Sequence, residues 1–450
     1  MNQVFAHYLQ ERLPRYTSYP TAPQFRRSDT ANPDYASWLA AVEPQASGSI
    51  YIHVPFCRQM CWYCGCHTKI TRQQQPVLDY LGALRREIGL VARHMRAAPK
   101  IRSLHFGGGT PTILEPADFR ALMGLLRDEF DIDPAAEIAI EIDPRTLTPD
   151  MVDTLGACGV NRASLGVQSF DATVQKAIAR VQTVEQTAEA VKNLRAAGIA
   201  RINLDLIYGL PHQTVASCAD TVAHCVAMQP DRLAVFGYAH VPSFKKHQRK
   251  VDEAALPGAE GRVEQAAAIA SALCDAGYES IGIDHFARPD DPLALAARAG
   301  TLHRNFQGYT CDDADFLIGL GASAIGRFRN GYVQNEVPIG AYAERLAHGA
   351  LAASKTYAFT DDDRMRASII EKLMCRFRVD LAQECGKYGR DFRGVLAEAP
   401  QLRRLADDGL IRLEGSTVVV RPEAHCLVRK VASAFDAFLV GAPKVFSPAV

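Results

Sequence analysis

Short apolar runs alternate with longer amphipathic stretches through the middle of the chain. The apolar runs have the length and composition of β-strands and lie at 49–55, 101–106, 137–142, 162–167, 201–207, 232–238 and 280–286. The stretches between them with helical spacing include 76–96, 116–129, 183–197 and 214–228. This alternation predicts parallel strands joined by right-handed crossovers. We therefore predict an α/β fold, a partial (β/α)6-type barrel whose chemistry lies at the carboxyl ends of its strands.

The pattern changes on both sides of this region. A polar N-terminal arm precedes the first strand, whereas two helical segments at 361–377 and 392–408 are followed by a hairpin at 410–422 that turns at Gly415–Ser416. We predict an arm (1–45), a catalytic barrel (46–355) and a smaller, mostly helical, winged-helix-like C-terminal domain (356–450). Because the last domain lacks a basic stripe, its pattern favours a structural cap or substrate lid over DNA binding.

Composition narrows the class of protein. The 450 residues are 48% hydrophobic and 22% charged, as in soluble globular proteins. Fifty basic residues balance fifty acidic ones, so no nucleic-acid partner is expected. The sequence shows neither a secretory signal nor an apolar run of about eighteen residues, so we expect a cytoplasmic protein without a membrane span. The lack of coiled-coil heptads favours a monomer.

Four of the twelve cysteines fall within the stretch CRQMCWYCGC, from Cys57 to Cys66. The other eight are single, and we expect them to be buried, inert thiols. Clustered cysteines in an intracellular protein indicate a metal site. Zinc sites usually use two separated pairs, and ferredoxins use C-x2-C-x2-C-x3-C. The spacing here is C-x3-C-x2-C-x-C, which matches neither.

The first three cysteines of the stretch, Cys57, Cys61 and Cys64, can wrap around one face of an iron–sulfur cubane. Cys66 is too close in sequence to Cys64 to reach the fourth iron comfortably. That iron would stay open to a small molecule, as catalytic metal sites generally keep one open position. The alternative is a cluster that only carries electrons or stabilises the fold.

Polar residues also occur where the predicted strands end. The segment HFGGGTPT (His105–Thr112) follows a strand, and its glycines let the backbone approach a ligand closely, although a tight turn would explain it as well. Its amide edges would lie at Gly108, Gly109 and Thr110. Glu141, Gln168 and Asp205 end later strands, where a barrel binds its ligand.

The spacing C-x3-C-x2-C resembles that of the radical S-adenosylmethionine (SAM) superfamily. The resemblance implies a [4Fe-4S] cluster on Cys57, Cys61 and Cys64, with SAM chelating the open iron. One electron from such a cluster splits SAM into methionine and a 5′-deoxyadenosyl radical, so the cofactor carries the chemistry and the protein supplies position.

A longer set of motifs resembles the oxygen-independent coproporphyrinogen III oxidase family over nearly the whole chain. These motifs are PRYTSYPTA, YIHVPFC, CWYCGC, HFGGGTPT, EIDPR, GVQSF, NLDLIYGLP, YAH, DHFARPDD, HRNFQGYT and GLGASAI. The resemblance implies a partial barrel with a helical C-terminal domain. It also implies oxidative decarboxylation of the ring A and B propionates of coproporphyrinogen III to vinyl groups, giving protoporphyrinogen IX. A flavodoxin-like one-electron donor and an unknown electron acceptor would be partners.

The same resemblance implies two SAM molecules. The SAM on the cluster would contact Tyr51, Gly108, Glu141 and Ile325. The second would contact Tyr63, Gly109, Thr110, Gln168, Arg180, Asp205 and Ala239. Cys66 matches a cysteine that activity requires although it is no cluster ligand, and Phe306 and Gln307 match residues close to the active site.

Substrate carboxylates need cations, and Arg15, Lys69 and Arg304 are candidates by their place in matching motifs. The chain departs from the family in two places. Ser169 stands where the family usually has aspartate, and Ala179-Arg180-Val181-Gln182 replaces Asn-Arg-Glu-Gln.

Three other functions fit parts of this pattern: a haem-binding chaperone of the same superfamily, a radical methyltransferase that opens haem, and a diverged enzyme acting on another tetrapyrrole. Cys66 and the PRYTSYPT arm disfavour the chaperone, which lacks both features. HRNFQGYT and DHFARPDD resemble the oxidase more than the methyltransferase.

Overall fold

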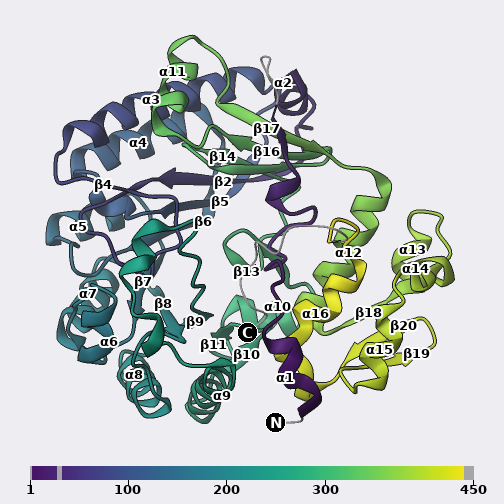
Figure 1. Ribbon diagram of the computed structural model, residues 1–450. Coiled ribbons are helices and arrows are strands. Elements are labelled where there is room, and N and C mark those ends of the chain that lie inside the picture. The colour runs from purple at the N-terminus through teal and green to yellow at the C-terminus, as the bar shows by residue number, and fades with distance from the viewer. Residues whose placement is uncertain (1–2, 28–32, 440–450) are drawn as a thin grey trace.

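The computed structural model describes residues 3–27 and 33–439. One sheet dominates it, with the strand order β1-β17-β16-β15-β14-β2-β5-β6-β7-β8-β9-β11-β10 (Figure 1). Its central strands are all parallel: β14 (Phe316–Leu320), β2 (Ser47–Val54), β5 (Lys100–Gly108), β6 (Ile132–Ile142), β7 (Arg162–Gln168), β8 (Arg201–Tyr208) and β9 (Arg232–Gly237). The sheet curves but ends at β1 (Arg26–Arg27) and β10 (Glu279–Ile281), so the barrel is open. The predicted α/β fold with a partial barrel is confirmed.

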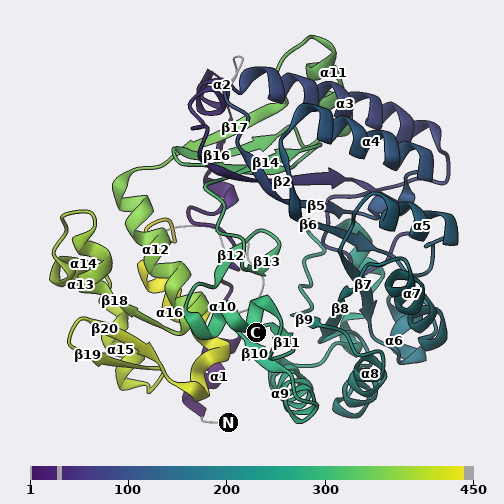
Figure 2. The same ribbon diagram turned by 180° about the vertical axis from the view of Figure 1, so that it is seen from behind.

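Helices cover the outer face of this curved sheet, as Figures 1 and 2 show from opposite sides. They are α3 (Gln75–His94), α4 (Pro116–Glu129), α5 (Pro149–Ala157), α6 (Ala172–Ala177), α7 (Val184–Ala196), α8 (Val215–Ala227) and α9 (Ala259–Asp275). Helix α4 shows why they pack there, because Phe119, Leu122, Met123 and Leu126 recur at helical spacing on one face and are fully buried. The predicted helices at 76–96, 116–129, 183–197 and 214–228 are therefore confirmed within two residues at each end.

Successive side chains on a strand point to opposite faces of the sheet, and this fixes which residues face the interior of the barrel. On β5, Leu104 and Phe106 are fully buried in the core beneath the helices, so His105 between them faces the other way. The same alternation places Leu204 and Leu206 of β8 in the core and turns Asp205 inward. Polar residues at strand ends thus collect inside the barrel.

Antiparallel strands extend both ends of the sheet. On one side lie β15 (Ile325–Phe328), β16 (Gly331–Asn335) and β17 (Ala353–Ala358), and on the other lies β11 (His285–Ala287). The prediction of a single strand at 280–286 is wrong, because β10 and β11 form a hairpin around Gly282, whose φ of +60° reverses the chain. The remaining elements before the C-terminal region are β3 (Phe56–Cys57), β4 (Lys69–Ile70), α10 (Pro292–Ala299), the hairpin β12 (His303–Asn305) and β13 (Gly308–Thr310), and α11 (Ile339–Ala347).

The C-terminal region is helical with a small sheet, as predicted. It contains α12 (Asp361–Arg376), β18 (Arg378–Asp380), α13 (Leu381–Gly386), α14 (Phe392–Glu398), α15 (Gln401–Asp407), β19 (Ile411–Glu414), β20 (Thr417–Val420) and α16 (Val428–Ala432). Strands β19 and β20 form the predicted hairpin around Gly415–Ser416. The single helix predicted at 392–408 is wrong, because the chain breaks between α14 and α15 at Ala399–Pro400.

The segment predicted as an N-terminal arm packs in two places. Apolar residues of helix α1 (Gln3–Leu9) and of the segment up to Tyr19 pack in one buried cluster with residues of the C-terminal region, such as Phe435. Helix α2 (Pro33–Ala40) instead contributes Tyr35 and Leu39 to the main core beneath the barrel strands. The division into domains at residues 45 and 355 stays a prediction.

All twelve cysteines are free thiols. All eight cysteines outside the cysteine stretch were predicted to be buried. Five of them are: Cys158, Cys218, Cys225, Cys375 and Cys385. The prediction is wrong for Cys274 and Cys426, which are exposed, and Cys311 is only half-buried. Among the described residues, no helix is long and apolar enough to cross a membrane.

Candidate active site

A cavity of about 580 Å³ opens at the carboxyl ends of the parallel strands. Its walls are the cysteine loop, the turn after β5 and the ends of β6, β7, β8 and β9. Most of the residues that the sequence singled out line it together: Cys57, Cys61, Tyr63, Cys64, Cys66, Gly108, Gly109, Thr110, Glu141, Gln168, Arg180, Asp205 and Ala239. The structure therefore brings together residues that are up to 182 positions apart in the chain.

The cysteine loop connects β3 to β4 and is fixed at both ends. The amide of Lys69 donates to the carbonyl of Pro55 at 2.7 Å, and the amide of Thr71 donates to the carbonyl of Cys57 at 3.0 Å. These two bonds close the loop at its base. The cysteines are therefore presented on a short loop held between two paired strands.

A second segment, the 3-10 helix η3 (Lys246–Lys250) with the residue before it, holds the far side of the loop. Its side chains bond loop carbonyls: Lys245 Nζ to Cys66 at 2.9 Å, His247 Nε2 to Cys64 at 2.7 Å and Gln248 Nε2 to Tyr63 at 2.9 Å. These contacts join residues more than 170 positions apart, so nothing local in the sequence signalled them.

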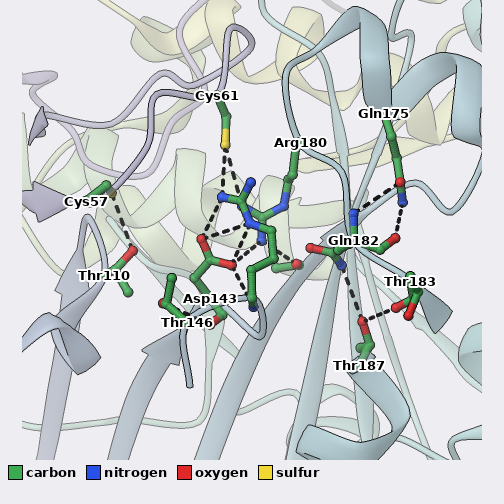
Figure 3. Close-up of polar contacts among 12 residues, drawn as sticks. Cys57, Cys61, Thr110, Asp143, Thr146, Gln175, Arg180, Gln182, Thr183 and Thr187 are labelled. Atoms are coloured by element: carbon green, nitrogen blue, oxygen red, sulfur yellow. Dashed lines mark hydrogen bonds and ion pairs between the residues drawn. The ribbon is translucent and has the colours of Figure 1, made fainter. Parts of the chain in front are cut away.

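Hydrogen-bond donors surround the first two thiols (Figure 3). The hydroxyls of Thr68 and Thr110 both donate to Cys57 Sγ at 3.4 Å. Burial raises the pKa of the Cys57 thiol, and these two hydroxyls offset part of the rise. Arg145 and Arg180 donate to Cys61 Sγ at 3.4 and 3.6 Å. Such donors stabilise a thiolate, which is the form that binds iron.

Three cysteines of the loop suit an iron–sulfur cluster and not a single metal ion. In the described ranges, no group of three His, Cys, Asp or Glu side chains is close enough to hold one metal ion. A [4Fe-4S] cluster does not require such convergence, because each thiolate binds a different iron. Three thiols on one cavity wall, two of them accepting hydrogen bonds, therefore fit an iron–sulfur cluster.

Asp143 and two arginines form an ion-pair group beside Cys61. Figure 3 shows Arg180 between Cys61 and Asp143. Asp143 accepts from Arg145 Nη2 at 2.7 Å and from Arg180 Nη2 at 3.4 Å, while Arg180 also donates to the carbonyl of Gly166 at 2.6 Å. Burial acts to raise the pKa of Asp143, but the bond from Arg145 and the charge of Arg180 hold it below its usual value. Sequence reasoning missed Asp143 and Arg145, although their position in EIDPR, directly after β6, was a usable signal.

The glycine turn after β5 leaves no room for side chains. A Cβ added at Gly108 would lie 2.6 Å from the ring of His53, and one added at Gly109 would lie 2.5 Å from the carbonyl oxygen of Phe56. The sequence placed backbone amides at Gly108, Gly109 and Thr110 against a ligand. In the structure, the N–H groups of all three residues already donate hydrogen bonds within the protein. Gly108 donates to Glu141 at 3.0 Å, and Gly109 and Thr110 donate to backbone carbonyls at 2.9 and 2.8 Å. A ligand group that donates hydrogen bonds would therefore have to contact the carbonyls of this turn.

The ends of β7 and β8 contribute Gln168 and Asp205. Gln168 has a φ of +70°, a conformation that costs a non-glycine residue about 1–3 kcal/mol and that recurs at functional sites. Asp205 accepts hydrogen bonds from Ser164 and Asn203, both at 2.8 Å. Burial raises the pKa of Asp205 to about 6, and these two bonds offset only part of that rise.

Asp205→Asn should make stability less dependent on pH. A carboxyl whose folded-state pKa is raised from 3.8 to about 6 favours folding most below pH 4, and this contribution is lost as the pH rises through 6. The variant should therefore be more stable than the parent at pH 7.5, by about 3 kcal/mol, with the difference vanishing towards pH 4. Anaerobic denaturant unfolding at several pH values measures this difference. A difference that does not change with pH would contradict the prediction.

Four predicted site residues lie outside the lining of this cavity. Tyr51 donates to His53 Nδ1 at 3.0 Å and pairs across the sheet with Gly319, which in turn lies against the backbone of Ile325. Phe306, at the turn between β12 and β13, lines a separate cavity of about 200 Å³, and Gln307 beside it is exposed. The functional roles of these four residues stay predictions.

The family departures also lie outside the cavity lining. The Ser169 side chain is fully buried and accepts from the amide of Asp171 at 3.2 Å. Val181 is 63% exposed, so its side chain points away from the cavity. Gln182 is buried in a polar group with Gln175 and Thr187 (Figure 3). The substitutions thus alter the supporting loop and leave Arg180 in the cavity.

Comparison with known proteins agrees with this geometry. The family model described as the radical SAM superfamily matches residues 51–225, and the HemN C-terminal domain matches residues 359–425. Together with the cysteine loop, these matches define a radical SAM protein.

The similarity to curated proteins extends over almost the full chain. The oxygen-independent coproporphyrinogen III oxidase of Bradyrhizobium diazoefficiens is 56% identical over 98% of both chains. That of Pseudomonas aeruginosa is 43% identical over 95% of this chain and 93% of its own. The solved coproporphyrinogen III oxidase (HemN) of Escherichia coli, described as a radical SAM enzyme, superposes with a TM-score of 0.90 at 39% identity, covering 96% of this chain and 100% of its own. The chain belongs to the oxygen-independent coproporphyrinogen III oxidase family.

Proposed function

We propose that the protein oxidatively decarboxylates the ring A and B propionates of coproporphyrinogen III to vinyl groups, giving protoporphyrinogen IX without oxygen. The observation that carries this proposal is full-length similarity to enzymes of that name, combined with a cavity that gathers the cysteine loop and the strand-end residues. Each propionate would lose one hydrogen atom from its β-carbon, then CO2 and one electron, and a carbon–carbon double bond would form. The electrons leave with an acceptor.

The chain's own residues would hold the cofactors in place. Cys57, Cys61 and Cys64 would bind a [4Fe-4S] cluster, which with SAM supplies a 5′-deoxyadenosyl radical. Arg145 and Arg180 would orient the Cys61 sulfur through their hydrogen bonds. Substrate bound over the open side of the cavity would exclude water from the reacting carbon.

Two SAM molecules would divide the remaining site residues. For the first, we propose Tyr51, Gly108, Glu141 and Ile325, where the Glu141 carboxylate can accept from ribose hydroxyls. For the second, we propose Tyr63, Gly109, Thr110, Gln168, Arg180, Asp205 and Ala239, all of which line the one cavity. Phe306 and Gln307 would act near the substrate from the β12–β13 turn.

The proposed setting is a cytoplasmic monomer that binds its tetrapyrrole substrate directly. A flavodoxin-like donor would supply single electrons to the cluster, and an unidentified acceptor would remove those released by decarboxylation. The free state of all twelve cysteines is compatible with a reducing compartment.

The test is an anaerobic assay of the reconstituted protein with SAM, a reductant, coproporphyrinogen III and a cell extract as the source of acceptor. Mass spectrometry should show a tetrapyrrole that has lost two carboxyl groups. If SAM is cleaved while the tetrapyrrole is returned unchanged, the substrate assignment fails although the radical SAM class stands.

Cys66→Ala should retain the cluster and lose the reaction. Cys66 lines the cavity beside Cys64, and as a thiol that is not needed for ligation it can transfer a proton or hydrogen atom near the substrate. Positioned proton-transfer groups contribute at least about 100-fold, so the rate of tetrapyrrole conversion should fall by that factor or more. Iron content and the visible absorbance of the cluster should equal those of the parent.

The matched control for Cys66 is Cys274→Ala, which removes another exposed thiol outside the lining of this cavity and should leave the rate unchanged. Loss of iron from the Cys66 variant would show instead that this cysteine is a ligand.

A further inference from the structure

A second cavity of about 390 Å³ adjoins the first, and four arginines line it. The two cavities share part of their wall: Arg15, Phe236, Gly237 and Tyr238 line both. The second cavity extends from there between β9, α9, the β10–β11 hairpin and the C-terminal helix α16. A ligand longer than either cavity could therefore occupy both at once.

The charges in this second cavity are unbalanced. Among the described residues, its lining holds Arg15, Arg262, Arg304 and Arg429 but only two carboxylates, Asp284 and the exposed Glu423. Burial lowers the pKa of Arg262, and the neighbouring charge of Arg15 lowers it further. Placing the guanidinium groups of Arg15, Arg262 and Arg304 in one cavity is electrostatically unfavourable. Anionic groups of a ligand would relieve it.

Arg304 is deeply buried in this cavity. Its side chain is only 4% exposed, its Nη2 lies 3.6 Å from Asp284 Oδ2, and its guanidinium stacks 4.4 Å from the ring centre of Tyr309. Among the described residues, its Nε and Nη1 have no hydrogen-bond partner. Buried guanidinium N–H groups are almost always hydrogen-bonded. The Nε and Nη1 groups of Arg304 are therefore suited to donate to an acceptor on a ligand.

Arg262, on helix α9, has surroundings similar to those of Arg304. It stacks 5.7 Å from the ring centre of Tyr208, and its Nε also lacks a partner in the described part of the chain. Stacking on an aromatic ring fixes the plane of a guanidinium and leaves its edge for bidentate contact with a carboxylate. The walls between the arginines are apolar, formed by residues such as Val235, Val263 and Ile283.

We propose that this arginine cavity binds the propionates that the reaction leaves intact, those on the ring C and D side of the tetrapyrrole. The inference rests on the proposed function and adds a subsite to it. Apolar walls would contact the pyrrole edge, and the arginines would hold its carboxylates. The edge with the reacting propionates would then reach through the shared wall into the cysteine cavity. Lys69, the third cation suggested by the sequence, is exposed and outside the lining of both cavities.

The experiment compares coproporphyrinogen III with its ring C and D dimethyl ester as substrates of the holoenzyme. Loss of charge-assisted hydrogen bonds should raise the KM of the ester about tenfold or more over that of the free acid. Arg304→Gln should raise the KM of the acid to a similar degree and leave the KM of the ester nearly unchanged. Arg304→Lys should restore part of the affinity for the acid.

Two controls separate binding from folding. The SAM affinity of each variant should equal that of the parent, and if Arg304→Gln fails to fold, Arg262→Gln provides the same comparison. The matched substitution Arg201→Gln lies at the start of β8, the opposite end of the barrel, and should leave both KM values unchanged.

The outcomes are distinguishable. If the parent uses the ester as well as the acid, or if Arg304→Gln weakens both substrates equally, the subsite is refuted while the proposed function stands. If the parent converts neither substrate, the proposed function itself fails, and the subsite fails with it.

Discussion

Replacing Cys61 with alanine is expected to remove the iron–sulfur cluster and reduce tetrapyrrole conversion to background. Cys61 is buried in the cavity wall, and its sulfur accepts from two arginines, Arg145 and Arg180. Without the thiolate, the cluster would lose one of three protein ligands, and the two guanidinium groups would face an apolar methyl. Iron analysis, visible absorbance and the anaerobic assay should all report the loss.

Cys158→Ala is the matched control, because Cys158 is also a buried cysteine but lies under the barrel helices, away from the cavity. It should keep full iron content and most of its activity. If the Cys61 variant retained a cluster with the parent's absorbance, the assignment of ligands would be wrong.

Replacing Gly108 with alanine is expected to weaken SAM binding strongly. Gly108 has a φ of +114°, which L side chains rarely adopt, and its added Cβ would lie 2.6 Å from the ring of His53. That ring cannot move freely, because it bonds Tyr51 at 3.0 Å and the carbonyl of His67 at 3.0 Å. Relief of the clash must shift the turn, at a cost of about 2 kcal/mol. If the cost falls on the SAM-bound form, affinity drops roughly 30-fold.

Equilibrium binding of SAM to the reconstituted variant measures this effect. Gly124→Ala is the control, since an added Cβ there meets nothing within 4 Å and the residue lies within α4. The control should bind SAM as the parent does and be slightly more stable. Equal SAM affinity in the Gly108 variant would place the cofactor away from this turn.

Much of the fold could be predicted because its signals are local. The bounds of α4 follow from an apolar face that recurs at helical spacing and from Pro116 at its first turn. The errors occurred where one backbone angle overrides the side-chain pattern. At Gly282 an apolar run looks continuous in sequence, yet a φ of +60° divides it into two strands.

The site was predictable for a different reason. Glu141, Gln168 and Asp205 lie at or near the carboxyl ends of neighbouring parallel strands, and the parallel topology brings those ends together. Residues whose role depends on packing between distant segments were missed. Lys245 reaches Cys66, and Arg262 reaches the second cavity, only because α9 and η3 return to the barrel mouth. Nothing in their neighbouring sequence indicates that return.

The packing of the N-terminal segment has a consequence for how the protein is made. The segment carrying Arg15 runs between the barrel and the C-terminal helices in both views (Figures 1 and 2). It is fixed by residues near the other terminus: Lys430 pairs with Glu11 at 2.7 Å, and Tyr16 donates to Asp436 at 3.1 Å.

Because synthesis runs from the N-terminus, Glu11 and Tyr16 are made more than 400 positions before the partners that fix them. The cysteine loop and glycine turn are also synthesised well before these partners, so the partners that fix the segment carrying Arg15 beside their cavity come later in the chain. Closure of this side of the cysteine cavity therefore depends on packing at residues 430–436, far from the cavity in sequence.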